Sequence, residues 1–343
     1  MSGHVLSRAP VHSRLRAYPL RYEPAAITTS SLLTPVLGPG ILSCHRCSAC
    51  EPLGLFRFEP AECPDQLFLK VVSRANLDRE QATAEMAHYL AHHQVPIVTS
   101  ILSTPRPIGN DYAFVAYPLI DGHFAVPTVS ELDQLGQALA LMHHVLRSIP
   151  RASAIQSASD ARLQRLEQRR RQFRLTSLPG IPQHLKLSID SMGSSWAKLP
   201  GMPQAVHGDL HHGNVLFDAS GHLHLLDLED AQHSYLPPTI DIAMVIERFV
   251  LALVESDDGV LQLAKAFLEG YQKVSKKPLF HQHGELARLL RWLSARAVLI
   301  LAETGGAVTT IDEEWKKFDE LAQLHVRRQD LLKAIERPFL LSR

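Results

Sequence analysis

The residues best suited to do chemistry lie in a short stretch of the second half of the chain. Residues 207–214 read HGDLHHGN, and an acidic segment, LLDLED, follows at 225–230. Phosphoryl transfer needs a carboxylate beside the attacking hydroxyl and divalent cations on the phosphate oxygens, all held in line. Asp209 and Asn214, five residues apart, can serve a hydroxyl and a Mg²⁺ ion together, and Asp227 adds a second hard oxygen ligand. The spacing therefore indicates phosphoryl transfer.

This pattern resembles the aminoglycoside phosphotransferase and choline kinase superfamily, whose catalytic loop commonly reads HGDLHxGN. The resemblance implies that Asp209 is the catalytic base, Asn214 a Mg²⁺ ligand and Asp227 the principal Mg²⁺ ligand. It also places a bracing aspartate for the catalytic loop at Asp241, in the segment TIDIA. The cofactors it implies are ATP and Mg²⁺.

Two further residues of these segments have supporting roles by the same resemblance. His207 is expected to be a structural residue of the loop, and Glu229 to lie next to the metal ligands without binding the metal itself.

The first part of the chain should supply the nucleotide site. Lys70 lies in a strand, where the family carries the lysine that contacts the α- and β-phosphates. On the helix that follows, Glu85 is the preferred ion-pair partner of Lys70, and Glu80 is the competing choice.

The segment FVAYPLIDG, residues 114–122, resembles the hinge between the lobes of such enzymes. The carbonyl of Pro118 and the N–H of Ile120 are the expected adenine contacts. A proline can accept a hydrogen bond there but cannot donate one, which suits the accepting position.

The loop that covers the phosphates is expected near residues 43–50, although this segment is not glycine-rich. Backbone N–H groups and the hydroxyls of Ser43 or Ser48 could hold phosphate oxygens there.

All four cysteines fall in or just after this segment, at Cys44, Cys47, Cys50 and Cys63. Their spacing allows a four-thiolate metal site, a redox-sensitive loop, or four free thiols.

Composition places few limits on partners. The chain of 343 residues has 35 basic and 35 acidic side chains and is 45% hydrophobic, which is ordinary for a globular protein. Neither nucleic acid nor a membrane is expected as a partner. The first 22 residues carry four arginines and no acid, and are interpreted as a basic tail rather than a targeting segment. The expected location is the cytoplasm.

The elements that must position these residues follow from local patterns. We expect a first strand within residues 27–42, strands at 55–59 and 67–72, a helix from Asp78 to His92, and a strand at 111–120.

The rest of the chain is mostly helical by its periodicity. One helix begins at Ser130 and a basic one spans 162–174, a hairpin pairs 214–217 with 222–226, and helices dominate from residue 240.

The expected architecture is a two-lobed, protein-kinase-like α+β fold. Residues 1–26 form a disordered tail, 27–120 an N-lobe with a small antiparallel sheet, and 121–343 a mostly helical C-lobe.

The expected reaction moves the γ-phosphoryl group of ATP to a hydroxyl of a small molecule such as an aminoglycoside, choline, homoserine or a sugar. A catalytically silent pseudokinase and a Ser/Thr protein kinase of the same superfamily are the alternatives.

Overall fold

The computed structural model describes residues 22–24, 27–45, 53–61, 66–173, 189, 199–303 and 311–341. These residues form two compact units. The sheet unit consists of Ala17–Ala125 and Gly213–Gln232, and the helical unit contains Val126–His212 and His233–Arg343. The units differ from the expected lobes, because the segments 121–125 and 213–232, both expected in the C-lobe, belong to the sheet unit.

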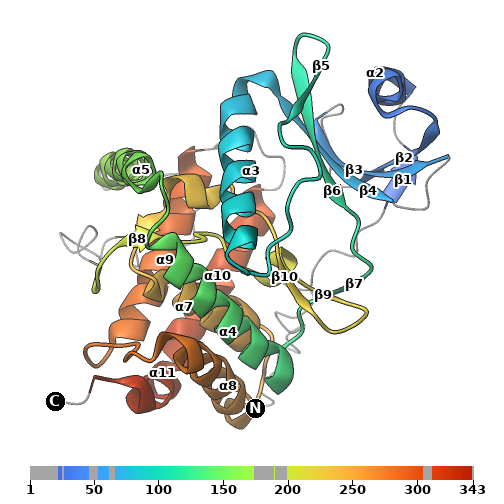
Figure 1. Cartoon of the computed structure of the whole chain (residues 1–343). Coiled ribbons are helices and arrows are strands. Elements are labelled where there is room, and N and C mark those ends of the chain that lie inside the picture. The colour runs from blue at the N-terminus through green and yellow to red at the C-terminus, as the bar shows by residue number, and fades with distance from the viewer. Residues whose placement is uncertain are drawn as a thin grey trace, which may run out of the picture. The chain divides into compact units, whose positions relative to one another are not determined.

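The main sheet of the sheet unit is antiparallel and has the strand order β1-β2-β3-β4-β6-β5 (Figure 1). Its strands are β1 (Tyr22–Pro24), β2 (Gly40–His45), β3 (Gly54–Pro60), β4 (Leu67–Ser73), β5 (Arg106–Ile108) and β6 (Tyr112–Pro118). The expected strands at 55–59, 67–72 and 111–120 correspond to β3, β4 and β6.

The two faces of this sheet have different partners. Leu69 and Val71 of β4 belong to a buried cluster with Leu33 of helix α2 (Ile27–Leu37). Successive side chains of a strand alternate between faces, so Lys70 points the other way. That second face carries α3 (Leu77–His92), because Lys70 bonds to Glu80 on this helix.

One local prediction is wrong in this unit. Residues 27–37 form helix α2 and the strand begins only at Gly40, so β-branched Thr and Val side chains there do not decide the local structure. The helix expected from Asp78 to His92 is α3, which begins at Leu77 after a 3-10 turn at Arg74–Asn76.

A second, three-stranded sheet completes the sheet unit. It has the order β10-β9-β7, with β7 (Gly122–Phe124), β9 (Val215–Asp218) and β10 (Leu223–Leu225). The β9–β10 hairpin is the one expected from the sequence. The backbone groups of Leu225 bond to those of Pro96 and Val98, which tie β10 to the segment after α3.

The helical unit is built around a close pair of helices, α4 (Val129–Leu146) and α8 (Asp257–Ser275). A Cβ atom at Gly136 would collide with the backbone carbonyl of Phe267, so glycine permits this approach. The oxygen Oγ1 of Thr128 caps α4 by accepting a hydrogen bond from the N–H of Glu131, at 3.2 Å.

The other elements of this unit pack around that pair. They are α5 (Ala152–Phe173), β8 (Gln204–Ala205), β11 (Tyr235–Leu236), α7 (Thr239–Val245), the π-helix η5 (Ile246–Leu251), α9 (Glu285–Glu303), α10 (Ile311–Arg327) and α11 (Gln329–Glu336). The largest buried side chains in this unit are Trp292, Phe249, Phe267 and Phe280.

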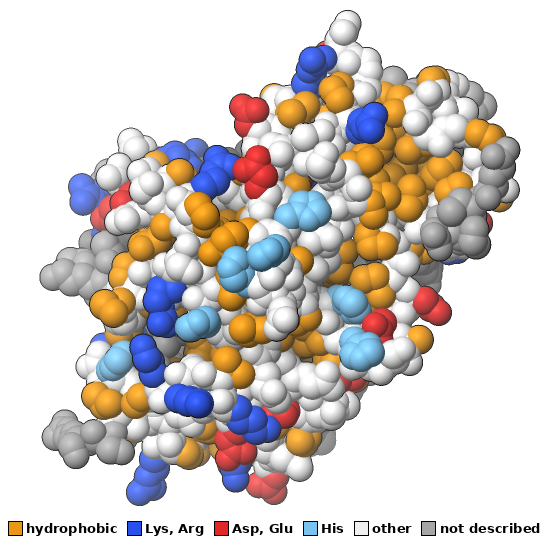
Figure 2. All heavy atoms as spheres, viewed as in Figure 1, with side chains coloured by type: hydrophobic (Ala, Val, Ile, Leu, Met, Phe, Trp, Pro, Cys, Tyr) orange, Lys and Arg blue, Asp and Glu red, His pale blue; other side chains and the backbone are white. Residues whose placement is uncertain are grey.

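The basic stretch expected at 162–174 lies on α5. Figure 2 shows Lys and Arg side chains gathered over this helix. Glu167 accepts hydrogen bonds from Arg170 at 2.7 Å and from Arg171 at 2.9 Å, and the bond from Arg170 is the main reason that the pKa of Glu167 is lowered to about 2. Some of the positive charge on this helix is therefore paired within the helix.

None of the helices in the described ranges combines the length and the apolar character that crossing a bilayer requires.

Candidate active site

The sheet unit contains a cavity of about 280 Å³, and every residue that lines it belongs to that unit. Six of the residues singled out from the sequence line it: Lys70, Pro118, Ile120, Asn214, Asp227 and Glu229. Much of the remaining wall is apolar: Leu55, Phe68, Ala87, Ile97, Val98, Leu119, Phe124, Leu216, Leu226 and Leu228. A mostly apolar wall with a few converging polar groups is the usual form of a small-molecule site.

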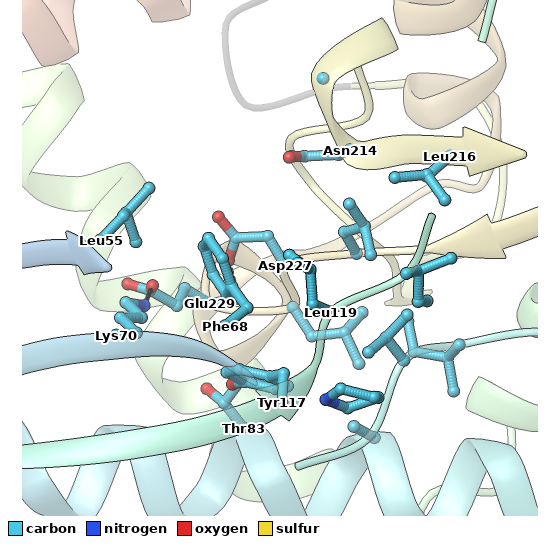
Figure 3. Close-up of a pocket in the computed structure, with 18 of the residues that line it drawn as sticks. Leu55, Phe68, Lys70, Thr83, Tyr117, Leu119, Asn214, Leu216, Asp227 and Glu229 are labelled. Atoms are coloured by element: carbon cyan, nitrogen blue, oxygen red, sulfur yellow. Dashed lines mark hydrogen bonds and ion pairs between the residues drawn. The ribbon is translucent and has the colours of Figure 1, made fainter. Parts of the chain in front are cut away.

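Lys70 reaches the cavity from β4, and acidic side chains hold its ammonium group. Its Nζ donates to Oε1 of Glu80 at 3.2 Å, and Glu80 is only 3% exposed. It also forms an ion pair with Glu229, which binds Arg79 at 3.4 Å (Figure 3).

The preference for Glu85 as the partner of Lys70 is therefore wrong. Glu85 is exposed and accepts a hydrogen bond from Gln81 at 3.0 Å. Five residues along a helix turn through about 140° beyond one full turn, so Glu80 and Glu85 cannot share a face.

Asn214 and Asp227 project from the hairpin segment into the cavity (Figure 3). The carbonyl of Asn214 accepts the N–H of Leu226 at 2.9 Å, so backbone pairing holds the two positions together. Asp227 has a φ of 55°, a left-handed backbone that is uncommon outside glycine and is often found at functional sites. Its Oδ1 accepts the N–H of Glu229 at 3.2 Å, which fixes the carboxylate.

These two side chains suit a magnesium ion by their chemistry. Carboxylate and amide oxygens are hard ligands, and Mg²⁺ usually takes one or two protein carboxylates and fills its remaining positions with phosphate oxygens and water. Lys70 in the same cavity supplies a positive charge for phosphate.

The hinge segment lines the cavity with backbone. The N–H of Leu119 donates to the carbonyl of Gln66 at 3.0 Å. In an extended chain, neighbouring residues direct their N–H and C=O groups to opposite sides. The carbonyl of Pro118, the last residue of β6, thus faces away from Gln66, as an adenine contact at this group would require.

Tyr117 is a cavity residue that the sequence did not single out. Burial raises its pKa well above the usual range, and the nearby carboxylates of Glu80 and Asp227 raise it further. Its hydroxyl therefore stays neutral.

The expected phosphate-covering loop is only partly described. Ser43 lies on β2 opposite Arg57 and is not one of the described residues that line the cavity. Ser48 lies outside the described residues. So do Cys47, Cys50 and Cys63, which leaves the thiolate site and the redox-sensitive loop as hypotheses.

Asp209 belongs to the helical unit, where the HGD segment is held tightly. Gly208 has a φ of 82°, a conformation that favours glycine. The N–H groups of His207 and Gly208 donate to the two oxygens of Asp241, at 2.8 and 2.9 Å. Asp241 thus braces this loop through its backbone.

Asp241 is itself part of a buried polar network. His143 lies 2.9 Å from Oδ2 of Asp241 through Nε2 and 2.8 Å from the Tyr271 hydroxyl through Nδ1. Burial alone would raise the pKa of Asp241, but the hydrogen bond and charge of His143, the charge of His207 and the N–H of Gly208 hold it below its ordinary value. The carboxylate is therefore kept ionised inside the protein.

The family follows from a match of residues 56–275 to the phosphotransferase enzyme family, which covers more than half of the chain. The chain belongs to this phosphotransferase family. The resemblance stated from the HGDLHHGN motif is thereby confirmed.

Three solved structures similar to this phosphotransferase show its fold. The amicoumacin kinase hAmiN, solved with AMP-PNP and Ca²⁺, is 16% identical with a TM-score of 0.58, over 90% of this chain and 89% of that one. Spectinomycin phosphotransferase, solved with ADP and spectinomycin, is 13% identical with a TM-score of 0.57, over 91% and 99%. Choline kinase LicA from Streptococcus pneumoniae is 13% identical with a TM-score of 0.57, over 88% and 98%. No curated protein matches the sequence.

These likenesses confirm the predicted protein-kinase-like α+β fold.

Two arginines bind the loop of this phosphotransferase, and Arg248 was missed in the sequence. Arg248 Nη1 donates to Oδ1 of Asp209 at 2.9 Å, and Arg296 Nη1 donates to the carbonyl of Gly208 at 3.2 Å. No local motif marks Arg248. The one available signal was a charged pair, Glu247 and Arg248, inside the otherwise apolar run 242–254.

Proposed function

We propose that this phosphotransferase moves the γ-phosphoryl group of ATP to a hydroxyl of a small molecule. The observation that carries the proposal is the cavity of the sheet unit, which gathers Lys70, Asn214 and Asp227 beside the hinge backbone. Lys70 comes from β4, and Asn214 and Asp227 flank the β9–β10 hairpin; each of the three suits one part of a magnesium–nucleotide complex.

The residues of the cavity bind and orient the nucleotide in this proposal. The apolar wall excludes water from the adenine ring, and the backbone at Pro118 and Ile120 provides its hydrogen bonds. Lys70 holds the phosphates, while Glu80 keeps the ammonium group in place. Asn214 and Asp227 would hold Mg²⁺, which neutralises charge on the phosphate oxygens when bound.

Asp209 acts on the acceptor. Its carboxylate, 42% exposed, accepts the proton of the acceptor hydroxyl as that oxygen bonds to phosphorus and the bond to the leaving ADP oxygen breaks. Because phosphoryl transfer has a loose transition state, orienting the hydroxyl matters more here than a strong base.

The acceptor class is a neutral or charged small molecule with a free hydroxyl, such as an aminoglycoside, choline, homoserine or a sugar. The amicoumacin kinase, the spectinomycin phosphotransferase and the choline kinase found by structural similarity are named for small molecules. This likeness supports a small-molecule acceptor.

The test is ADP release with ATP and Mg²⁺ over a panel of hydroxylated metabolites and antibiotics, comparing wild type with Asp209→Ala. We expect acceptor-dependent turnover that falls about 10²-fold or more in the variant, with nucleotide affinity nearly unchanged. If wild type and variant both bind ATP but neither releases ADP with any acceptor of the panel, the result favours the pseudokinase or the protein kinase. Absence of ATP binding would refute the assignment of the cavity.

A further inference from the structure

The carboxylate of Asp209 is held on one side by a partly buried arginine. Arg248 Nη1 lies 2.9 Å from Oδ1, and the Arg248 side chain is only 14% exposed although its partner is 42% exposed. His211 lies on the other side, with Nε2 3.8 Å from Oδ2. The two oxygens of Asp209 therefore have different neighbours, because the guanidinium bonds to Oδ1 and the imidazole of His211 lies beside Oδ2.

Arg248 lies in η5, the π-helix that directly follows α7. Residues Ile246–Leu251 form a π-helix, and the N–H of Ala252 donates to the carbonyl of Glu247, five residues back, at 3.0 Å. Such wide turns are rare and frequently occur at functional sites, since they change which way a side chain points.

Glu247 and His325 form a buried pair next to Arg248. Glu247, 2% exposed, lies with Oε2 3.6 Å from Nε of Arg248 and with Oε1 3.0 Å from Nε2 of His325 on α10. Burial would lower the pKa of Arg248, but the charges of Asp209 and Glu247 raise it above its ordinary value. The guanidinium is thus held as a cation by carboxylates on both sides.

We propose that Arg248 is a positioning residue for the base: it binds Oδ1 of Asp209 and thereby presents Oδ2 to the acceptor hydroxyl, with Glu247 and His325 holding the arginine in place. The inference rests on the proposed role of Asp209. A fixed carboxylate lowers the entropy cost of aligning the hydroxyl with phosphorus, and this alignment is the main requirement of a loose transfer.

Pairing with Arg248 also has an electrostatic consequence. A neighbouring cation favours the ionised form of a carboxylate, which is the form of Asp209 that can accept a proton. Other titratable or charged groups of the described residues also lie around this pair. His207 and His211 belong to the loop, and Asp241 to α7. Arg296 lies on α9 and His325 on α10.

The experiment uses the full chain and ATP hydrolysis with water as acceptor, so the natural acceptor need not be known. Arg248→Ala should lower kcat about tenfold or more and leave KM for ATP nearly unchanged. Millimolar guanidinium chloride should restore part of the rate, whereas sodium chloride at the same ionic strength should not. Arg248→Lys should retain an intermediate rate. Arg291→Ala, which removes an exposed arginine of the same unit, is the matched control and should respond to neither salt.

A second measurement does not depend on turnover. The ¹³C carboxyl signal of Asp209, assigned by its loss in Asp209→Asn, should titrate at a higher pH in Arg248→Gln than in wild type. A purely structural role for Arg248 would lower the melting temperature without moving this titration.

The outcomes separate the two proposals. If Arg248→Ala and Arg248→Lys lose activity equally, guanidinium has no effect and the Asp209 titration does not move, the role of Arg248 is refuted while the proposed function stands. If wild type and Asp209→Ala release ADP at the same rate, the proposed function fails and the inference fails with it.

Discussion

The Asp209 loop and the cavity of the sheet unit are built in opposite ways. The loop is a short segment held by side chains from distant helices: Asp241 and Arg296 bond to its backbone and Arg248 bonds to the carboxylate of Asp209, while His143 bonds to Asp241. The cavity is an apolar enclosure into which a few polar groups project from three stretches of the chain. Hydrogen bonds therefore determine the position of the proposed base, whereas side-chain packing determines the shape of the proposed nucleotide site.

This difference predicts how the two regions respond to substitution. A buried polar network is cooperative, so loss of one member leaves other groups without partners and affects both stability and rate. A polar group that projects into an apolar cavity can be replaced without disturbing the wall, so its loss should affect binding and rate but not folding. The following predictions test this contrast.

The largest effect is expected in the cavity, from Asp227→Asn. Asparagine tolerates the left-handed backbone and keeps the oxygen that accepts the N–H of Glu229, so the fold should remain intact. Loss of the charge should lower Mg²⁺-dependent ATP turnover by about 10²- to 10³-fold. Steady-state kinetics and a thermal melt measure the two quantities.

The control for this substitution is Asp230→Asn, which changes a nearby acid that is not among the described residues lining the cavity. Equal losses of rate in both variants would contradict a specific role for Asp227.

The next effect is expected in the loop network, from Asp241→Asn. Hydrogen bonds to a buried charge contribute about 2 kcal/mol, and we expect this loss in the free energy of unfolding at neutral pH together with a fall in turnover. Urea denaturation monitored by circular dichroism measures it.

The pH dependence of Asp241→Asn has a definite sign. The pKa of Asp241 is lower in the folded protein than its ordinary value, so its stabilising contribution is complete above the unfolded pKa of about 3.9. That contribution is lost as the pH falls from there through the folded pKa. The stability gap between wild type and variant should therefore narrow below about pH 4, and a constant gap would contradict this account.

The smallest effect is expected at the lysine pair. Glu80→Gln removes the charge that holds Lys70, and loss of about 1.5 kcal/mol should raise KM for ATP about tenfold. Glu85→Gln, on the exposed side of the same helix, is the matched control and should leave KM unchanged. If Glu85→Gln has the larger effect, the ion pair of the structure is not the functional one.

The HGDLHHGN loop could be predicted because its chemistry is contained in adjacent residues. Asp209 and Asn214 have fixed spacing, and Gly208 is needed for the left-handed turn beside Asp209. Lys70 could be predicted because a strand with a lysine precedes an alanine-rich helix. Such signals do not depend on knowing how distant segments pack.

The errors concern features that depend on packing. The choice between Glu80 and Glu85 required the phase of α3 relative to Lys70, which the sequence does not determine. Helix α2 buries Leu33 against the sheet, and this tertiary contact overrides the strand preference of its neighbours. Arg248 is 39 residues from Asp209 and has no motif of its own, so only the structure reveals their contact.

The sheet unit is discontinuous in the chain, and this affects how it can form during synthesis. Strand β7 ends at Phe124, but its partner β9 begins only at Val215, after a long stretch of the other unit has been translated. During synthesis on the ribosome, β7 therefore lacks its partner strand until the β9–β10 hairpin has been translated. A fragment that stops at residue 125 would lack Asn214 and Asp227, so the proposed nucleotide site cannot be isolated as an N-terminal truncation product.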